Sequence, residues 1–145
     1  MELLCPAGNK ESLIAAINSG ADAIYLSGKK FGARAFATNF SNEELKEAIR
    51  IGKIYGVKIY VTMNTLIKEN EIDEFLSQVE FLYSNGVDAI LMQDFGMICL
   101  CLKKYPNLEI HASTQAHNSS QQGIDFLYKL GVKRVVLPRE MSLDE

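Results

Sequence analysis

One short pattern occurs four times in the chain and constrains its fold more than any other feature. Each copy has a glycine, a small apolar residue, a charged residue and then a mostly apolar run, beginning at Gly20, Gly56, Gly86 and Gly131. A glycine directly after a helix takes the left-handed conformation that ends it, and a short apolar run with β-branched residues is typical of a buried strand. Each copy therefore marks the end of a helix and the start of a strand, and the intervals between copies are long enough for one strand–helix unit.

The pattern predicts six strands with helices between them. Capping signals predict helix starts at Asn9 with Ser12, at Ser41 with Glu44, and at Ser142 with Glu145. The predicted strands are Leu3–Cys5, Ala23–Leu26, Val57–Met63, Ala89–Met92, Leu108–Ala112 and Arg134–Leu137.

Six parallel strands with intervening helices fit either an open doubly wound sheet or six eighths of a (β/α)₈ barrel. No G-x-G-x-x-G follows the first strand, so a sheet of the dinucleotide-binding kind loses support. We therefore predict an α/β fold, a partial TIM-like (β/α) barrel of about six parallel units that lacks the last strands. Residues 1–145 are then the N-terminal portion of a barrel domain that is truncated at its C-terminal end.

Composition adds limits on compartment and partners. With 145 residues, 48% of them hydrophobic and 23% charged, the chain has the balance of one globular domain. It has neither a long apolar run nor a signal segment, so we expect a cytoplasmic protein without a membrane partner. A net charge of −3 argues against a broad nucleic-acid surface but leaves room for a local one. Cys5, Cys99 and Cys101 form no metal-binding spacing, so we predict packing thiols and no metal site.

Polar residues follow nearly every predicted strand. In both architectures ligands bind beyond the carboxyl ends of the strands. Side-chain alternation places Tyr60, Thr62 and Asn64 on one side of the third strand, and His111 and Ser113 on one side of the fifth. In a barrel these rows point inward, near the mouth, where polar groups need hydrogen-bond partners. The candidate site residues are Arg34, Asn64, Gln93, Asp94, His111, Ser113, Thr114, Gln115, Arg139 and Glu140.

Four of these candidates have a structural interpretation beside the functional one. His111 fits a hydrogen-bonded core histidine as well as a general base. Asp94 fits the N-cap of the helix that follows it as well as a catalytic carboxylate. Arg139 with Glu140 fits a surface ion pair as well as a substrate clamp.

Two further interpretations concern loops at the mouth. The segment Gly28–Arg34 contains two glycines and three cations, but it lacks the Walker spacing, so we interpret it as a lid over the mouth rather than a phosphate loop. A nucleophilic role for Ser113 or Thr114 has little support because neither lies in a G-x-S-x-G elbow.

The residues at these strand ends also resemble a known family, the collagenase-like peptidases numbered thirty-two in peptidase family U. The resemblance spans essentially the whole chain. The matching stretches are Glu2–Leu4 with Pro6–Asn9, Gly20–Leu26, Phe31–Ala35, Asn39–Ser41, Tyr60–Leu66, His111–Gln115 and Arg134–Leu137 with Arg139–Glu140.

The resemblance implies a TIM-like barrel in an enzyme classed as a peptidase whose catalytic dyad is unassigned. Under this first hypothesis His111, Asn64, Asp94 and Glu140 are catalytic. His111 activates water or a hydroxyl, and Arg34 or Arg139 stabilises the oxyanion. The other candidates, Gln93, Ser113, Thr114 and Gln115, bind a peptide substrate together with the two arginines.

Two alternatives remain open. Other members of the family resemble iron–sulfur proteins that hydroxylate nucleobases in RNA or precursors of ubiquinone, so the parent would act on RNA with a cluster held by cysteines beyond this chain. This chain itself would then hold no cofactor. The third hypothesis is an inactive structural fragment, which would form a homodimer that covers its exposed sheet edges.

Overall fold

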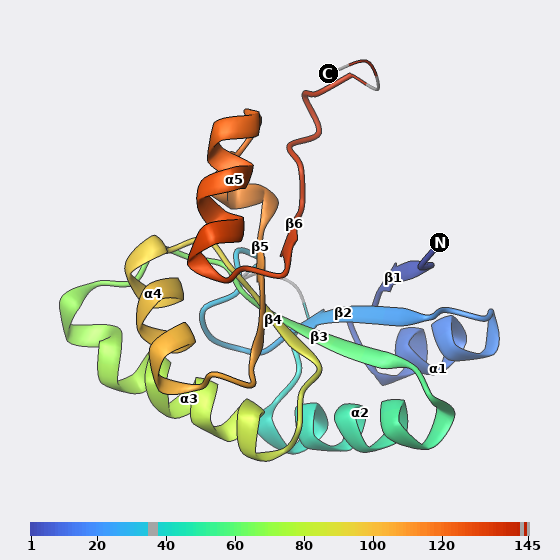
Figure 1. Cartoon of the computed structure of the whole chain (residues 1–145). Helices are drawn as coiled ribbons and strands as arrows, with labels where there is room; N and C mark the ends of the chain where they lie inside the picture. The colour runs from blue at the N-terminus through green and yellow to red at the C-terminus, as the bar shows by residue number, and fades with distance from the viewer. Residues whose placement is uncertain (35–37, 143, 145) are drawn as a thin grey trace.

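Six parallel strands form one curled sheet, with five α-helices along its convex side (Figure 1). The computed structural model describes residues 1–34, 38–142 and 144. Ala35 of the resembling stretch and Glu145 of the last predicted helix start lie outside these residues. The elements are β1 (Leu4–Pro6), α1 (Lys10–Asn18), β2 (Ala23–Ser27), α2 (Asn42–Tyr55), β3 (Lys58–Met63), the 3₁₀ turn η1 (Glu69–Glu71), α3 (Ile72–Ser84), β4 (Ala89–Met92), α4 (Phe95–Lys104), β5 (Glu109–Ala112), the 3₁₀ turn η2 (Thr114–Ala116), α5 (Gln121–Leu130) and β6 (Arg134–Val135).

The strand order β1-β2-β3-β4-β5-β6 confirms the predicted partial barrel, because every strand pairs in parallel with the next strand along the chain. This sequential order is that of a (β/α) barrel, whereas a doubly wound sheet reverses direction at a switch point. None of the helices formed by the described residues is long and apolar enough to cross a membrane.

The helix boundaries follow the local signals in the sequence. Asn9 and Ser41 head α1 and α2 with capping boxes, in which each side chain accepts a hydrogen bond from the backbone three residues on. Gly56 ends α2 with φ of +68°, and Gly131 ends α5 with φ of +111°. The other two junction glycines also have positive φ, so all four copies of the pattern act as predicted.

The charged residue of the junction has a role in two copies that the pattern alone does not reveal. Asp22 accepts a hydrogen bond from the Leu3 N–H at 2.7 Å, and Asp88 accepts one from the Ile59 N–H at 2.8 Å. Each carboxylate therefore joins the start of one strand to the strand before it. Hydrogen bonds with a charged acceptor are stronger than neutral ones, so these contacts help to fix the register at the amino ends of the strands.

The two faces of the sheet differ as side-chain alternation predicts. On β3, Ile59, Val61 and Met63 are buried in the main core between the convex face and the helices. Tyr60, Thr62 and Asn64 alternate with them and point to the concave side, which no helix of the described chain covers (Figure 1). The helices contribute Leu13, Leu45, Ile49, Phe75, Val79, Leu82, Ile98 and Leu127 to the core.

We predict that Asp88→Ala lowers the free energy of unfolding by about 1–3 kcal/mol, because the part-buried Ile59 N–H loses its carboxylate acceptor. Urea denaturation of this chain measures the change. Lys133→Ala is the matched control: Lys133 occupies the corresponding place in the fourth junction, its side chain is exposed, and its backbone bond to Ile110 is unaffected. Equal losses in the two variants would contradict the role assigned to Asp88.

Candidate functional site

A cavity of about 480 Å³ opens on the concave side at the carboxyl ends of the strands. Its walls come from β1, β2, β3 and β4, from the loop after β2 and from the segments that follow β5 and β6, so residues far apart in the sequence meet there. The apolar part of the wall includes Leu4, Tyr25, Leu91 and Val136. The polar part includes Arg34, Thr62, Asn64, Ser113, Thr114, Gln115 and Arg139. We call this space the mouth cavity.

Asn64 connects three of the segments that form the mouth cavity. Its Oδ1 accepts a hydrogen bond from the Ala33 N–H at 3.0 Å, and its Nδ2 donates to Ser113 Oγ at 3.1 Å. Its backbone carbonyl accepts from Gln93 Nε2 at 2.8 Å. Asn64 therefore joins the segment that carries Arg34 to the ends of β4 and β5.

Two arginines lie at the rim of the mouth cavity. Arg34 and Arg139 are both exposed and both line it. The backbone carbonyl of Arg34 accepts a hydrogen bond from Asn39 Nδ2 at 3.0 Å, which is a second contact that holds the segment. One guanidinium group can donate two parallel hydrogen bonds to two oxygens of a phosphate or carboxylate group. The rim is therefore suited to an anionic ligand.

Four predicted site residues, Gln93, Asp94, His111 and Glu140, lie outside the walls of the mouth cavity. Asp94 caps α4 by accepting from the Met97 N–H at 3.1 Å, and it also accepts from the Ile67 N–H at 3.2 Å, which agrees with its structural interpretation. Gln93 donates a hydrogen bond to the backbone carbonyl of Asn64. Glu140 is exposed in the segment after β6.

His111 lies deeper on the concave side, at 1% exposure, and it is not among the residues that line the mouth cavity. Its ring meets Tyr60 edge-on, with centroids 4.9 Å apart, and its Nε2 lies 2.8 Å from Glu109 Oε1. This placement matches the interpretation of His111 as a hydrogen-bonded core histidine. Because His111 does not line the mouth cavity, the structure gives no support to its predicted catalytic role.

A second set of contacts below the mouth cavity connects the first and the last strands. Glu2, just before β1, accepts hydrogen bonds from both terminal nitrogens of Arg134 on β6 and from Tyr60 Oη at 3.0 Å. Arg134 also lies over the Tyr60 ring at 5.4 Å. We call Glu2, Tyr60, Glu109, His111 and Arg134 the floor network. Local patterns gave no signal for the pair of Glu2 and Arg134, because these residues are 132 positions apart.

Charge and burial set the protonation states of the floor network. The Arg134 guanidinium lowers the pKa of Glu2. Burial, aided by the Glu2 carboxylate, raises the pKa of Tyr60 to about 12. Burial lowers the pKa of His111, so its ring is neutral near pH 7 and its Nε2–H donates to the Glu109 carboxylate.

The segment Gly28–Arg34, predicted to be a lid, is held in place at several points. Lys30 pairs with Glu74 of α3, Phe31 packs edge-on against Phe75 with centroids 5.3 Å apart, and Thr65 Oγ1 donates to the Phe31 carbonyl at 3.3 Å. Phe31 has φ of +63°, an uncommon conformation for a residue that is not glycine. These contacts fix the segment, and with it the position of Arg34.

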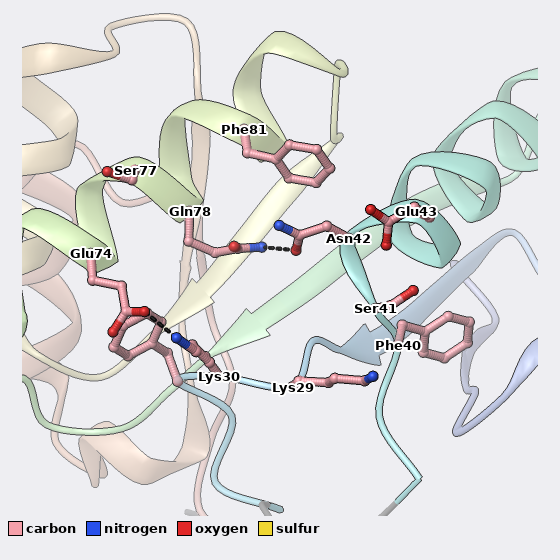
Figure 2. Close-up of a pocket in the computed structure, with 11 residues that line it drawn as sticks. Lys29, Lys30, Phe40, Ser41, Asn42, Glu43, Glu74, Ser77, Gln78 and Phe81 are labelled. Atoms are coloured by element: carbon pink, nitrogen blue, oxygen red, sulfur yellow. Dashed lines mark hydrogen bonds and ion pairs between the residues drawn. The ribbon is translucent and has the colours of Figure 1, made fainter.

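A second cavity of about 470 Å³ lies on the outer side of the same segment, between α2 and α3 (Figure 2). Lys30 and Glu74 pair at its edge, and Gln78 donates to Asn42 across it at 3.0 Å. Its two lysines are balanced by Glu43 and Glu74, so it offers no net charge to a ligand. The mouth cavity, with two arginines and no carboxylate among its lining residues, is the better candidate site.

The cysteines of the chain do not fit an iron–sulfur cluster. Cys5 lies on β1, whereas Cys99 and Cys101 lie on α4, and the described residues contain no group of three or more metal-binding side chains. Cys101 is buried, and burial raises its pKa to about 12, whereas a cluster is held by thiolates. Cys101 is therefore a packing thiol, as predicted.

A comparison with known proteins identifies the family to which this chain belongs. The model of peptidase family U32 matches residues 8–145, so the chain belongs to this family, as its resembling stretches implied. The solved structure of the U32 peptidase Mk0906 has the same fold, with a TM-score of 0.78 over 94% of this chain and 58% of that one, at 13% identity.

The curated relatives point to a different activity from the family name. The chain is 40% identical over 141 residues to tRNA hydroxylation protein P1 of Bacillus subtilis, covering 97% of this chain and 33% of the relative. It is 39% identical over 145 residues to the 23S rRNA 5-hydroxycytidine C2501 synthase of Escherichia coli, covering 100% of this chain and 22% of the relative. A collagenase of Porphyromonas gingivalis also matches, at 34% over 149 residues, covering 99% of this chain and 34% of the relative.

These relatives correct the first hypothesis, that of a peptidase. Relatives in Haemophilus influenzae and Helicobacter pylori also carry the name tRNA hydroxylation protein P, so names for RNA hydroxylation predominate among the similar proteins. The expectation was wrong because the motifs that carry the resemblance define the barrel and its strand ends. These features are shared across the family, whereas a reaction is decided by the site.

We predict that stability falls as the pH falls through about 6.5 and below, and that His111→Gln removes this part of the pH dependence. Burial lowers the pKa of His111 in the folded chain, so the unfolded chain binds the proton first and is stabilised by it. Urea denaturation between about pH 5 and pH 8 measures the slope. His117→Asn is the control, because His117 is exposed with φ of +49°, a conformation that asparagine tolerates. An unchanged slope in His111→Gln would count against the buried neutral ring.

Proposed function

We propose that the chain supplies the substrate-binding part of an enzyme that hydroxylates a nucleobase in RNA. The observation that carries the proposal is the mouth cavity with its arginine rim, in a chain whose relatives are named for hydroxylation of tRNA and rRNA. The chain spans 33% and 22% of the two relatives described above, so we also propose that it is the first part of a longer barrel.

The dimensions of the mouth cavity suit a single nucleotide. Its volume of about 480 Å³ lies within the roughly 300–1,000 Å³ of small-molecule sites. Enzymes that modify a base inside folded RNA take it out of the stack and hold it in a pocket. The apolar wall with Tyr25 offers contact to the flat base, and Thr62, Ser113 and Gln115 offer hydrogen bonds to its edge.

The charges around the mouth cavity suit the backbone of RNA. Arg34 and Arg139 lie at the rim, where the phosphates on either side of an extruded base would pass. The net charge of −3 for the whole chain means that affinity depends on this local pair rather than on a broad basic surface.

Hydroxylation also needs a redox group, and the described cysteines of this chain do not form a site for one. We therefore assign to this chain the binding and orientation of the base. The redox group belongs to residues outside it.

The test is deletion of the gene that encodes this chain in its host, followed by mass spectrometry of nucleosides from tRNA and rRNA. We expect one nucleoside that carries an extra oxygen atom to disappear and its unmodified form to accumulate. The wild-type gene should restore the modification.

Arg139→Ala should raise the KM for RNA about tenfold in the purified protein, because one phosphate contact is lost.

Lys133→Ala is the matched control, because it also removes an exposed cation but at the amino end of β6, away from the mouth cavity. It should leave the KM for RNA at the wild-type value, and an equal rise in KM in the two variants would contradict the role assigned to Arg139. A nucleoside profile that does not change on deletion would contradict the proposed function.

A further inference from the structure

Ser113 is a buried polar residue at the wall of the mouth cavity. It follows β5 directly, its exposure is 3%, and its side chain caps the 3₁₀ turn η2. Most of the other polar residues of the wall are exposed or half-buried. The hydrogen-bond state of Ser113 is therefore fixed by its protein neighbours rather than by solvent.

The neighbours of Ser113 use its oxygen as an acceptor only. Asn64 Nδ2 donates to Ser113 Oγ at 3.1 Å, and the Gln115 N–H donates to the same atom at 3.3 Å. A hydroxyl group has two acceptor lone pairs and one O–H donor. Both lone pairs are occupied, and no acceptor for the O–H is found among residues 1–34, 38–142 and 144.

The orientation of this hydroxyl is also fixed. Asn64 cannot turn its amide without losing the bond from Ala33, so its Nδ2 stays directed at Ser113. Two donors occupy two of the three free tetrahedral positions around the Ser113 oxygen, so the O–H takes the third position. Ser113 lines the mouth cavity, which is the space available to an acceptor for this O–H. Thr62 has the opposite polarity: its Oγ1 donates to the Leu26 carbonyl at 3.3 Å, which leaves its lone pairs as acceptors.

We infer that Ser113 selects the substrate by donating its O–H to a carbonyl oxygen of the bound base. The inference rests on the proposed function and adds a chemical requirement to it, since a buried donor without a partner disfavours any ligand that lacks an acceptor at this place. Uracil, cytosine and guanine carry such a carbonyl oxygen, and adenine does not. Asn64 is the positioning residue that keeps the donor in its direction.

The competing explanation is that Ser113 only caps η2. The chain offers a matched control in Ser120, which caps α5 by accepting from the Gly123 N–H at 3.2 Å and lies outside the mouth cavity. Both Ser113→Ala and Ser120→Ala remove a serine cap, but only the first removes a donor from the cavity.

The experiment uses the purified complete protein and two sets of RNA oligonucleotides that differ at the target base. One set carries the native base, and the other carries sulfur, a weaker acceptor, in place of each ring carbonyl oxygen in turn. For the wild type we expect kcat/KM to fall about tenfold or more for sulfur at one of the positions. Ser113→Ala should show the same fall with the native base and no further fall with that sulfur analogue.

Ser120→Ala should discriminate between the two substrates as the wild type does. If Ser113→Ala does not fold, Ser113→Cys keeps the side-chain shape with a weaker donor, and it should show the same loss of discrimination. Discrimination that stays at the wild-type level in these Ser113 variants overturns the inference and leaves the hydroxylase activity standing. Absence of any hydroxylation by the wild type, in contrast, overturns the proposed function and this inference together.

Discussion

The alternation of side chains along a parallel sheet in fixed register is the constraint on which both the core and the site depend. Thr62 pairs in register with Leu91, and Leu91 pairs in register with His111, so the inward side chains of adjacent strands stand next to one another on the concave face. A shift of β3 by one residue would turn Asn64 towards the helices and Met63 towards the mouth cavity. The junction aspartates Asp22 and Asp88, which join neighbouring strands at their amino ends, oppose such a shift.

The same register divides the concave side into two levels with different physical character. At the lower level the floor network pairs its charges internally, and burial keeps His111 neutral. At the upper level the polar groups are only partly paired, and Arg34 and Arg139 face solvent. Stability is therefore concentrated at the amino ends of the strands and binding capacity at the carboxyl ends, as in (β/α) barrels generally.

The sequence predicted the architecture well because its signals are local: glycines at helix ends, capping boxes, and period-two alternation in strands such as Lys58–Met63. Four of the candidate site residues that the sequence pointed to, Arg34, Asn64, Ser113 and Arg139, line one cavity. The roles within that set depend on contacts between distant segments, such as Glu2 with Arg134 and Asn64 with Ala33, which no local pattern shows. The reaction was misjudged because these shared strand ends accompany more than one chemistry in the family.

The central claim is that the mouth cavity receives the target base of an RNA. Photo-cross-linking tests it most directly, with a substrate RNA that carries a photoreactive base at the modified position and mass spectrometry of the cross-linked peptides of the complete protein. The account predicts cross-links to peptides that contain Tyr25, Leu91 or Val136, which form the apolar wall of the cavity. Cross-links confined to the outer helices, such as α2 and α3, would contradict it.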